Sequence, residues 1–336
     1  MDEELYPADS TDNYSYEYSI ESNICEMGDY FILYTHLTTV LYPLVFLLSL
    51  LGNTLVLWIL FKYENLTSLT NIFIMNLCVS DLVFSCMLPF WVVDQSFGWI
   101  FGEFLCKAVN AIFSTGYYSG VFFLTLMTIL RYLFVVNPLS NLRSQTQCYG
   151  FLVSLIVWTV SILIVVPEVI HTTVEEGLEE GWKCDTDWKW KKVDIYLRNV
   201  LFLLSFGVIV FCYFKILIIL LRARSRRKHR TVKLILIIVV AFFLCWAPYN
   251  ILSFLITFPS PTCQYQKDSH LAFYISRIIA FSHCCLNPVL YIFIGVKFKR
   301  HLAHICSHCV PCSNGQVSSP RICSAGRFQY EGASFY

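Results

Sequence analysis

Hydrophobic residues in this chain gather into seven long runs that are separated by polar segments. An α-helix rises about 1.5 Å per residue, so roughly 20 apolar residues cross the ~30 Å hydrocarbon core of a bilayer. The pattern predicts an all-α bundle of seven transmembrane helices. The expected spans are Leu37–Phe61, Ile72–Val93, Ala108–Val136, Phe151–Ile170, Tyr196–Leu221, Leu234–Phe258 and Leu271–Ile294.

Composition and charge support this interpretation and orient the bundle. Hydrophobic residues make up 57% of the 336 residues and charged residues only 14%. No Lys or Arg precedes Lys62, and nine acids lie between Asp2 and Asp29. Basic residues are concentrated between the fifth and sixth runs, from Arg222 to Lys233, and just after the seventh. Because Lys and Arg mark cytoplasmic loops, the N-terminus is expected outside the cell and the C-terminus inside.

This topology divides the chain into an extracellular acidic tail (1–35), a transmembrane domain (36–295) and a cytoplasmic part (296–336) with a short amphipathic eighth helix, Val296–His304. No basic segment precedes an early apolar run, so the first span is expected to act as the insertion signal, with the plasma membrane as destination. Asn13 begins a glycosylation sequon on the outer side.

Polar and helix-breaking residues occur within five of the runs, where each marks an interhelix contact or a functional site. They are Asn53, Asn76, Asp81, Pro89, Trp158, Pro167, Pro248, Asn287 and Pro288. A proline leaves the carbonyl four residues earlier without its helical donor and bends the helix. The prolines therefore suit either static kinks or a cavity with hinges.

Other classes of membrane protein are disfavoured. The chain has no His-Glu-x-x-His, Walker or Gly-x-Ser-x-Gly motif, and Asp81 is the one carboxylate that we place deep within a span. An intramembrane aspartyl dyad is therefore not expected, and neither a repeat nor a line of ionisable residues suggests a transporter. We expect no catalytic residues, no cofactor, no metal and no nucleic-acid partner.

Several motifs occupy fixed places in the spans. They are Gly52-Asn53, Asn76-Leu77 through Asp81, Arg131-Tyr132, Trp158, Cys245-Trp246-Ala247-Pro248-Tyr249 and Asn287-Pro288-Val289-Leu290-Tyr291. Together they resemble the rhodopsin-like G-protein-coupled receptors over nearly the whole chain. Leu88-Pro89-Phe90-Trp91, Gly98-Trp99-Ile100-Phe101-Gly102 and the segment from Phe281 to Pro288 resemble chemokine receptors. The segments Ser225–Lys233 and Tyr330–Tyr336 resemble their XC class, the lymphotactin receptors.

The resemblance implies a receptor that passes the binding of a basic, lymphotactin-like chemokine to a heterotrimeric G protein of the inhibitory class, with arrestin and membrane lipid as further partners. The implied ligand-binding residues are Tyr14, Tyr16, Tyr18, Tyr42, Trp91, Phe113, Tyr249 and Arg277. The implied residues of coupling and activation are Leu130, Arg131, Tyr132, Tyr213, Trp246, Asn287, Pro288 and Tyr291. The implied disulfides are Cys106–Cys184 and Cys25–Cys263; from topology alone, these four outer cysteines allow three pairings, or one bridge with two free thiols.

The chain departs from the family pattern at several places. Leu130 stands where an acid usually restrains Arg131, which is the reason for an alternative function: a scavenging receptor that binds chemokine without coupling to a G protein. Arg277 stands where chemokine receptors commonly carry a glutamate. The resemblance places an ion site at Asp81, but Gly116 and Gly120 stand where polar side chains usually help to hold sodium.

Two polar segments outside the spans have more than one interpretation. The tail, with acids beside Tyr14, Tyr16 and Tyr18, suits either a solvated segment or a tether for a basic protein, with sulfation adding charge. The inner cysteines Cys306, Cys309, Cys312 and Cys323 lie near three histidines, but their spacing fits no zinc finger, which favours acylation at the lipid surface.

Overall fold

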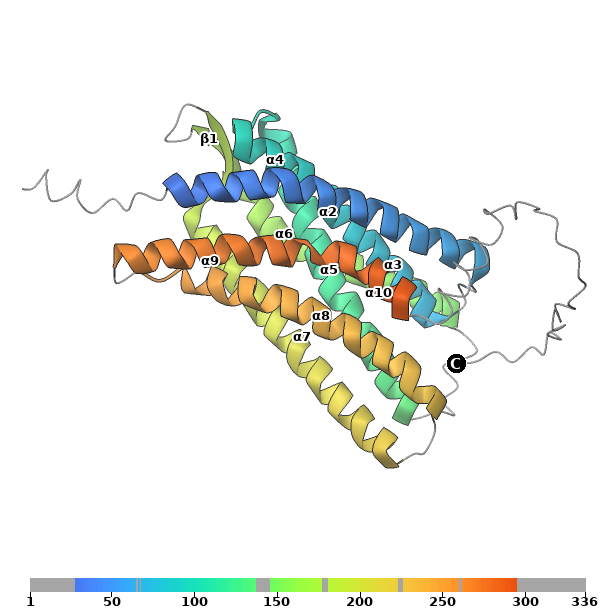
Figure 1. Ribbon diagram of the computed structural model, residues 1–336. Coiled ribbons are helices and arrows are strands. Elements are labelled where there is room, and N and C mark those ends of the chain that lie inside the picture. Colours follow the sequence, from blue (N-terminus) through green and yellow to red (C-terminus); the bar gives the residue numbers. More distant parts are fainter. Residues whose placement is uncertain are drawn as a thin grey trace, which may run out of the picture.

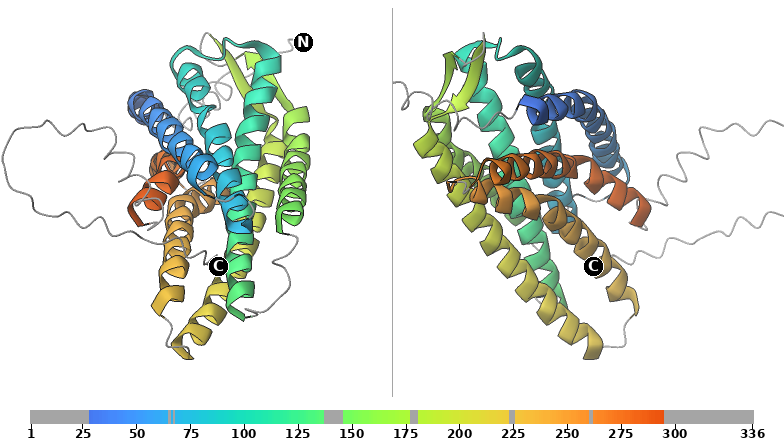
Figure 2. Two further views of the ribbon diagram at one scale, coloured as in Figure 1. Left: turned by 90° about the vertical axis from the view of Figure 1, so that its right-hand side faces the viewer. Right: turned by 60° about the vertical axis from the view of Figure 1, so that its left-hand side comes forward.

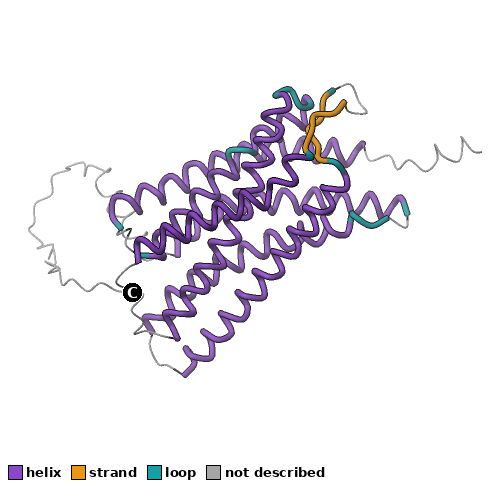
Figure 3. Tube along the Cα trace, turned by 180° about the vertical axis from the view of Figure 1, so that it is seen from behind, coloured by secondary structure: helices purple, strands orange, loops and turns teal. Residues whose placement is uncertain are grey.

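The computed structural model describes residues 28–64, 66, 68–136, 146–176, 181–222, 226–259 and 262–294. Helices account for most of them and pack lengthwise into one bundle (Figure 1). The helices are α2 (Gly28–Tyr63), α3 (Leu69–Ser85), α4 (Leu88–Phe97), α5 (Gly102–Val136), α6 (Thr146–Ile170), α7 (Trp188–Arg222), α8 (Arg226–Leu255), α9 (Cys263–Phe281) and α10 (His283–Ile294). The strands β1 (Thr172–Glu176) and β2 (Trp182–Thr186) form a hairpin at the outer end of the bundle (Figure 3).

Seven spans in the described ranges are long and apolar enough to cross a membrane, which confirms the predicted fold class. They are Ile32–Tyr63, Leu69–Phe97, Gly102–Val136, Cys148–Ile170, Trp188–Ile219, Leu236–Leu255 and Cys263–Leu290. The fifth and seventh spans begin before the predicted starts at Tyr196 and Leu271, because their first turns carry polar residues that break the apolar pattern. Thr262 caps the seventh, since its side chain accepts a hydrogen bond from the Tyr265 N–H at 3.2 Å.

The second span is broken between α3 and α4 by Pro89. Proline has no N–H, so the Ser85 carbonyl four residues earlier loses its helical donor. The chain passes the break in tighter turns, with Met87 N–H donating to the Phe84 carbonyl and Phe90 N–H to the Met87 carbonyl, both at 3.2 Å. Beyond this break α4 continues towards the outer end of the bundle (Figure 2), and Trp91 lies in its first turn.

The seventh span is broken at Ser282, and Pro288 lies within α10. Pro288 frees the Cys284 carbonyl, and α2 supplies the replacement donors: Asn53 Nδ2 at 3.0 Å and Ser49 Oγ at 3.5 Å. A Cβ at Gly52 would lie 2.7 Å from Pro288 Cγ, so only glycine allows this approach. The motif Gly52-Asn53 therefore accommodates the proline of another helix.

Asn76 joins α3 to α6. Its Nδ2 donates to Ser154 Oγ at 3.0 Å, and its Oδ1 accepts from Trp158 Nε1 at 2.9 Å. Gly150 on α6 lets the helices approach, because a Cβ there would lie 2.6 Å from Ile72 Cδ1. Two of the polar residues within the predicted spans, Asn76 and Trp158, thus form an interhelix contact.

The hairpin and the loop between α4 and α5 are tied to α5. Cys184 on β2 forms a disulfide with Cys106 on α5, as the family resemblance implied. Trp99 is 2% exposed although it lies in a loop: its N–H donates to the Trp182 carbonyl at 2.6 Å, and its Nε1 donates to the Gly102 carbonyl at 2.8 Å. Gly98, at φ 73°, passes too close to Trp182 to carry a Cβ. The outer end is therefore rigidly fixed.

Candidate functional site

The five predicted pocket residues come together in the outer half of the bundle, on five different helices, around the buried ring of Phe281. Phe281 lies 4.9 to 6.1 Å from the rings of Tyr42, Phe113 and Tyr249 and 5.2 Å from the Arg277 guanidinium carbon. Trp91 closes the group, 5.9 Å from the Phe113 ring and 5.7 Å from Arg277. Sequence reasoning missed Phe281, although it stands four residues after Arg277 and therefore on the same helix face.

Arg277 is held by aromatic faces. Its guanidinium group lies over the rings of Trp91 and Phe281, contacts that stabilise by about 0.5–2 kcal/mol each. Among the described residues, no carboxylate forms an ion pair with it. Asp94 on α4 interacts with Arg277 electrostatically, and its buried Oδ1 accepts no hydrogen bond in the described structure. This cluster thus combines a cation without an ion-pair partner and a carboxylate oxygen without a hydrogen bond, both among the described residues.

A polar rim, which sequence reasoning also missed, covers the outer side of this pocket. Gln95 Nε2 donates to the Tyr34 hydroxyl at 3.1 Å, and Gln95 Oε1 accepts from Thr38 Oγ1 at 2.5 Å. The Tyr34 hydroxyl also lies 3.3 Å from that of Tyr42, and its ring stacks on Tyr274 at 4.4 Å. The rim links α2, α4 and α9, so it sets the width of the pocket.

A second group of charges lies between α5, α6 and α7. Arg198 donates to Asp194 Oδ2 at 2.7 Å, the Tyr118 hydroxyl donates to Asp194 Oδ1 at 3.1 Å, and Ser114 Oγ donates to Glu168 Oε2 at 3.1 Å. Arg198 is 6% exposed. Glu168 and Asp194 lie near the outer ends of α6 and α7, so they do not contradict the expectation that Asp81 is the one carboxylate deep within a span, but sequence reasoning gave neither of them a role in this group.

Trp246 connects the pocket to the middle of the bundle. It is fully buried and lies 5.6 Å from the Tyr249 ring and 6.2 Å from Phe281 on the outer side. On the inner side its ring is 5.1 Å from His283. A ligand that moves Tyr249 or Phe281 therefore acts directly on Trp246.

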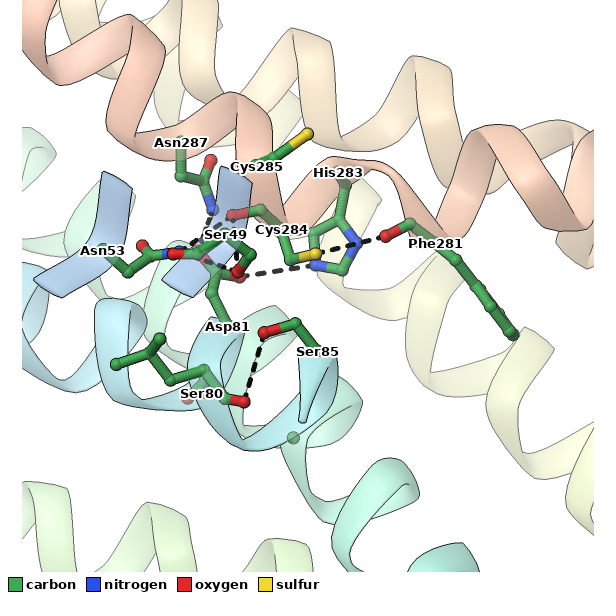
Figure 4. A network of polar contacts seen from close by, with 12 residues as sticks. Ser49, Asn53, Ser80, Asp81, Ser85, Phe281, His283, Cys284, Cys285 and Asn287 are labelled. Carbon is green, nitrogen blue, oxygen red and sulfur yellow. Dashed lines mark hydrogen bonds and ion pairs between the residues drawn. The ribbon is translucent and has the colours of Figure 1, made fainter. Parts of the chain in front are cut away.

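The middle of the bundle holds Asp81 in a polar network (Figure 4). Asn287 Nδ2 donates to Asp81 Oδ2 at 2.7 Å, and His283 Nε2 lies 3.5 Å from Asp81 Oδ1. The two predicted switch residues Asn287 and Pro288 thus lie where α10 meets α3 and α2. Sequence reasoning did not give His283 a role.

At the inner end of the bundle, the last two turns of α5 carry Leu130, Arg131 and Tyr132. No acidic side chain forms an ion pair with Arg131 among the described residues, as Leu130 implies. Tyr213 on α7 interacts with Arg131 electrostatically. The Tyr213 hydroxyl is buried and has no hydrogen-bond partner in the described part of the chain. Tyr132 packs on Phe211 at 6.2 Å, and Tyr291 lies in the last turn of α10.

The hairpin side of the outer face is charged. Asp185 on β2 pairs with Lys191 at 2.8 Å and Lys183 at 3.5 Å. Partial burial would raise the pKa of the Asp185 carboxyl, but the two ammonium groups and the Thr186 N–H outweigh it and hold that pKa below its usual range. Asp185 is therefore ionised at neutral pH.

Several predicted residues lie outside the described ranges: Asn13, Tyr14, Tyr16, Tyr18, Cys25, the amphipathic segment Val296–His304 and the inner cysteines. Cys263 is disulfide-bonded, but its pairing with Cys25 stays a prediction. Among the described residues, no group of three His, Cys, Asp or Glu side chains could hold a metal ion.

Seven membrane-spanning segments, packed into one bundle with the cluster around Phe281 in its outer half, are the architecture of a seven-transmembrane receptor. The family "7 transmembrane receptor (rhodopsin family)" matches residues 52–291. The chain is 51% identical over 326 residues to the human protein Chemokine XC receptor 1, covering 95% of this chain and 96% of that one. It is 48% identical over 329 residues to the mouse Chemokine XC receptor 1, with 97% and 99% covered. It is 34% identical over 316 residues to the human CX3C chemokine receptor 1, with 91% and 87% covered.

The chain belongs to the chemokine receptors of the rhodopsin family. It is a multi-pass protein of the plasma membrane, and it is not an enzyme. A chemokine and a G protein are the partners that this family implies.

Proposed function

We propose that this chain is a receptor for a basic chemokine of the lymphotactin kind and that it activates a heterotrimeric G protein of the inhibitory class. The acidic tail makes the first contact with the basic ligand, and the flexible end of the ligand then enters the pocket around Phe281. Identity of about half the residues to two XC receptors supports the choice of ligand class.

The observation that carries the proposal is the connected path from Arg277 through Phe281 and Trp246 to the Asp81 network. Each step is a contact between described side chains, at 5.2, 6.2 and 5.1 Å, ending at the 3.5 Å contact of His283 with Asp81. A ligand group that binds Arg277 displaces it from the two rings that now hold it. The consequence is a shift of Phe281 against Trp246, and this shift favours one state of the bundle over the other.

The test is nucleotide exchange by an inhibitory-class G protein on the purified receptor, with an XC-class chemokine as the probe. We expect ligand-stimulated exchange, and a loss of at least tenfold in potency for Arg277→Ala. The matched control is Lys107→Ala, which removes a basic side chain from the outer part of α5, where Lys107 pairs with exposed Glu103 at 2.6 Å.

Three outcomes separate the alternatives. Exchange that depends on Arg277 but not on Lys107 supports the proposal. Ligand binding without exchange would instead identify a scavenging receptor, the alternative that Leu130 suggests. Equal effects of the two variants would mean that the pocket cation has no specific role in ligand recognition.

A further inference from the structure

The network around Asp81 lies where receptors of this family are expected to hold sodium, so its fit to that ion can be tested. A hard cation binds several oxygen atoms at once, with its ligands preferably carboxylates, carbonyls, hydroxyls or water. Asp81 is 1% exposed and sits among His283, Asn287, Ser49 and Asn53 (Figure 4). The fit depends on whether oxygen atoms in this network are available to an ion.

Both carboxylate oxygens of Asp81 already face nitrogen atoms. Asn287 Nδ2 donates to Oδ2 at 2.7 Å, and His283 Nε2 faces Oδ1 at 3.5 Å. His283 Nδ1 lies 2.8 Å from the Ala280 carbonyl, which can only accept, so Nδ1 carries a proton. Nε2 faces the carboxylate, where a hydrogen bond to Asp81 Oδ1 needs a proton on one of these two groups, and with or without that bond the imidazole ring occupies the space beside Oδ1.

The two glycine positions of the third span supply no oxygen from a side chain. A Cβ at Gly116 would lie 3.0 Å from both the Cβ and the N of Phe84, so that position is closed, and the nearest atom to a Cβ at Gly120 is Leu77 Cδ1 at 4.0 Å. The Phe84 ring that fills this space also packs on His283 at 5.1 Å.

Most nearby hydroxyls and amide nitrogens are engaged elsewhere, and the exception is the buried Asn53 Oδ1, which has no hydrogen-bond partner in the described structure. Ser80 and Ser119 bond to one another at 2.8 Å and to the carbonyls of Asn76 and Gly116. Ser49 and the Asn53 amide nitrogen are directed at the Cys284 carbonyl that Pro288 frees. These donors complete the helix contacts and leave Asp81 as the one anionic oxygen ligand.

We propose that the core of this receptor excludes sodium and that His283 takes the place of the ion, linking α10 to α3 through Asp81. Replacing sodium by another monovalent cation at constant ionic strength should then leave the stability of the receptor unchanged. This inference does not depend on the identity of the chemokine.

The test compares thermal unfolding midpoints of the purified full chain in sodium chloride and in N-methyl-D-glucamine chloride at equal ionic strength. An ion that binds only the folded state raises the midpoint as its concentration rises. We expect no difference between the two salts for the unmodified receptor. A sodium-dependent rise that Asp81→Asn abolishes would overturn the proposal, whereas a rise that persists in Asp81→Asn is not due to this site and leaves it standing.

A variant designed to bind sodium tests which residues are responsible for excluding the ion. Gly120→Ser combined with His283→Asn adds a hydroxyl where there is room and frees Asp81 Oδ1, so we expect the midpoint of this double variant to rise with sodium. Gly207→Ser is the matched control, because no atom lies within 4 Å of a Cβ at Gly207. A double variant that responds no more than Gly207→Ser would overturn the assignment to His283 and Gly120.

Discussion

At the residue scale, most of the unusual side chains within the spans have a local physical reason. Asn53 replaces a donor that Pro288 removes, Asn76 bonds Trp158 and Ser154, and Asp81 bonds Asn287. Each of these three side chains forms at least one hydrogen bond, because a polar group left without a partner in lipid costs several kcal/mol. Polar residues of these spans therefore report contacts between helices as well as chemistry.

The first residue-scale prediction concerns Gly52. We expect Gly52→Ala to lower the thermal unfolding midpoint of the purified receptor, because the new Cβ would lie 2.7 Å from Pro288 Cγ and α2 must move away from α10. Overpacking of this kind costs about 1–3 kcal/mol. The control is Gly207→Ala, where nothing lies within 4 Å and a helical alanine stabilises by about 0.5–1 kcal/mol. If both variants change the midpoint equally, steric contact with Pro288 is not the cause.

Asn53 gives the second residue-scale prediction. Asn53→Leu removes the donor at 3.0 Å and leaves the Cys284 carbonyl with the weaker Ser49 contact at 3.5 Å. An unsatisfied buried acceptor costs about 1–3 kcal/mol, so the midpoint should fall. The double variant Asn53→Leu with Pro288→Ala restores a backbone donor to that carbonyl. Recovery of stability in the double variant is expected, and additive losses would contradict the pairing.

At the element scale, the breaks and ends of the helices determine which side chains meet around Phe281 and which are restrained at the inner surface. The breaks at Pro89 and Ser282 reorient α4 and α10, and this brings Trp91 to Phe113 and places Asn287 beside Asp81. The inner end of α5 differs, because Arg131 has no acidic partner among the described residues. A helix end without its restraint changes the balance between two states of the bundle.

Leu130 gives the prediction at this scale. We expect Leu130→Asp to lower ligand-independent nucleotide exchange, because the new carboxylate restrains Arg131 by about 1–3 kcal/mol. A change of about 1.4 kcal/mol shifts a two-state equilibrium tenfold. Basal and stimulated exchange are measured together at matched surface expression, with Leu130→Asn as the uncharged control. Appearance of stimulated exchange where the unmodified receptor has none would instead support the scavenging alternative.

At the scale of the whole molecule, charge separates the two faces. Acids dominate the tail before the first span, and basic residues lie between the fifth and sixth spans and after the seventh. Together with the rigid outer end made by the Cys106–Cys184 disulfide and the hairpin, this arrangement suits capture of a basic protein outside and docking of a G protein inside.

The prediction at this scale concerns the acidic tail. Deletion of residues 1–22 should weaken binding of an XC-class chemokine and reduce the dependence of its affinity on salt, because exposed charges are screened over about 8 Å at physiological ionic strength. Binding isotherms at low and high salt measure both effects. Unchanged affinity and an unchanged salt slope would show that the tail is not the tether.

The sequence by itself determined the seven spans and the family, and it predicted the orientation and five of the residues that the structure brings together around Phe281. Span length and charge bias depend on local composition, which the bilayer converts directly into topology. Tertiary structure alone decided the rest: Phe281 and the Tyr34–Gln95 rim of the pocket, the burial of Glu168 with Asp194 and Arg198, and His283 beside Asp81. Most of these groups come from helices far apart in sequence, whereas Asp194 and Arg198 pair four residues apart on α7. Whether side chains on different helices meet depends on where Pro89 and Pro288 redirect the chain and on where glycines let two helices approach. The distance between two helices cannot be read from a run of neighbouring residues.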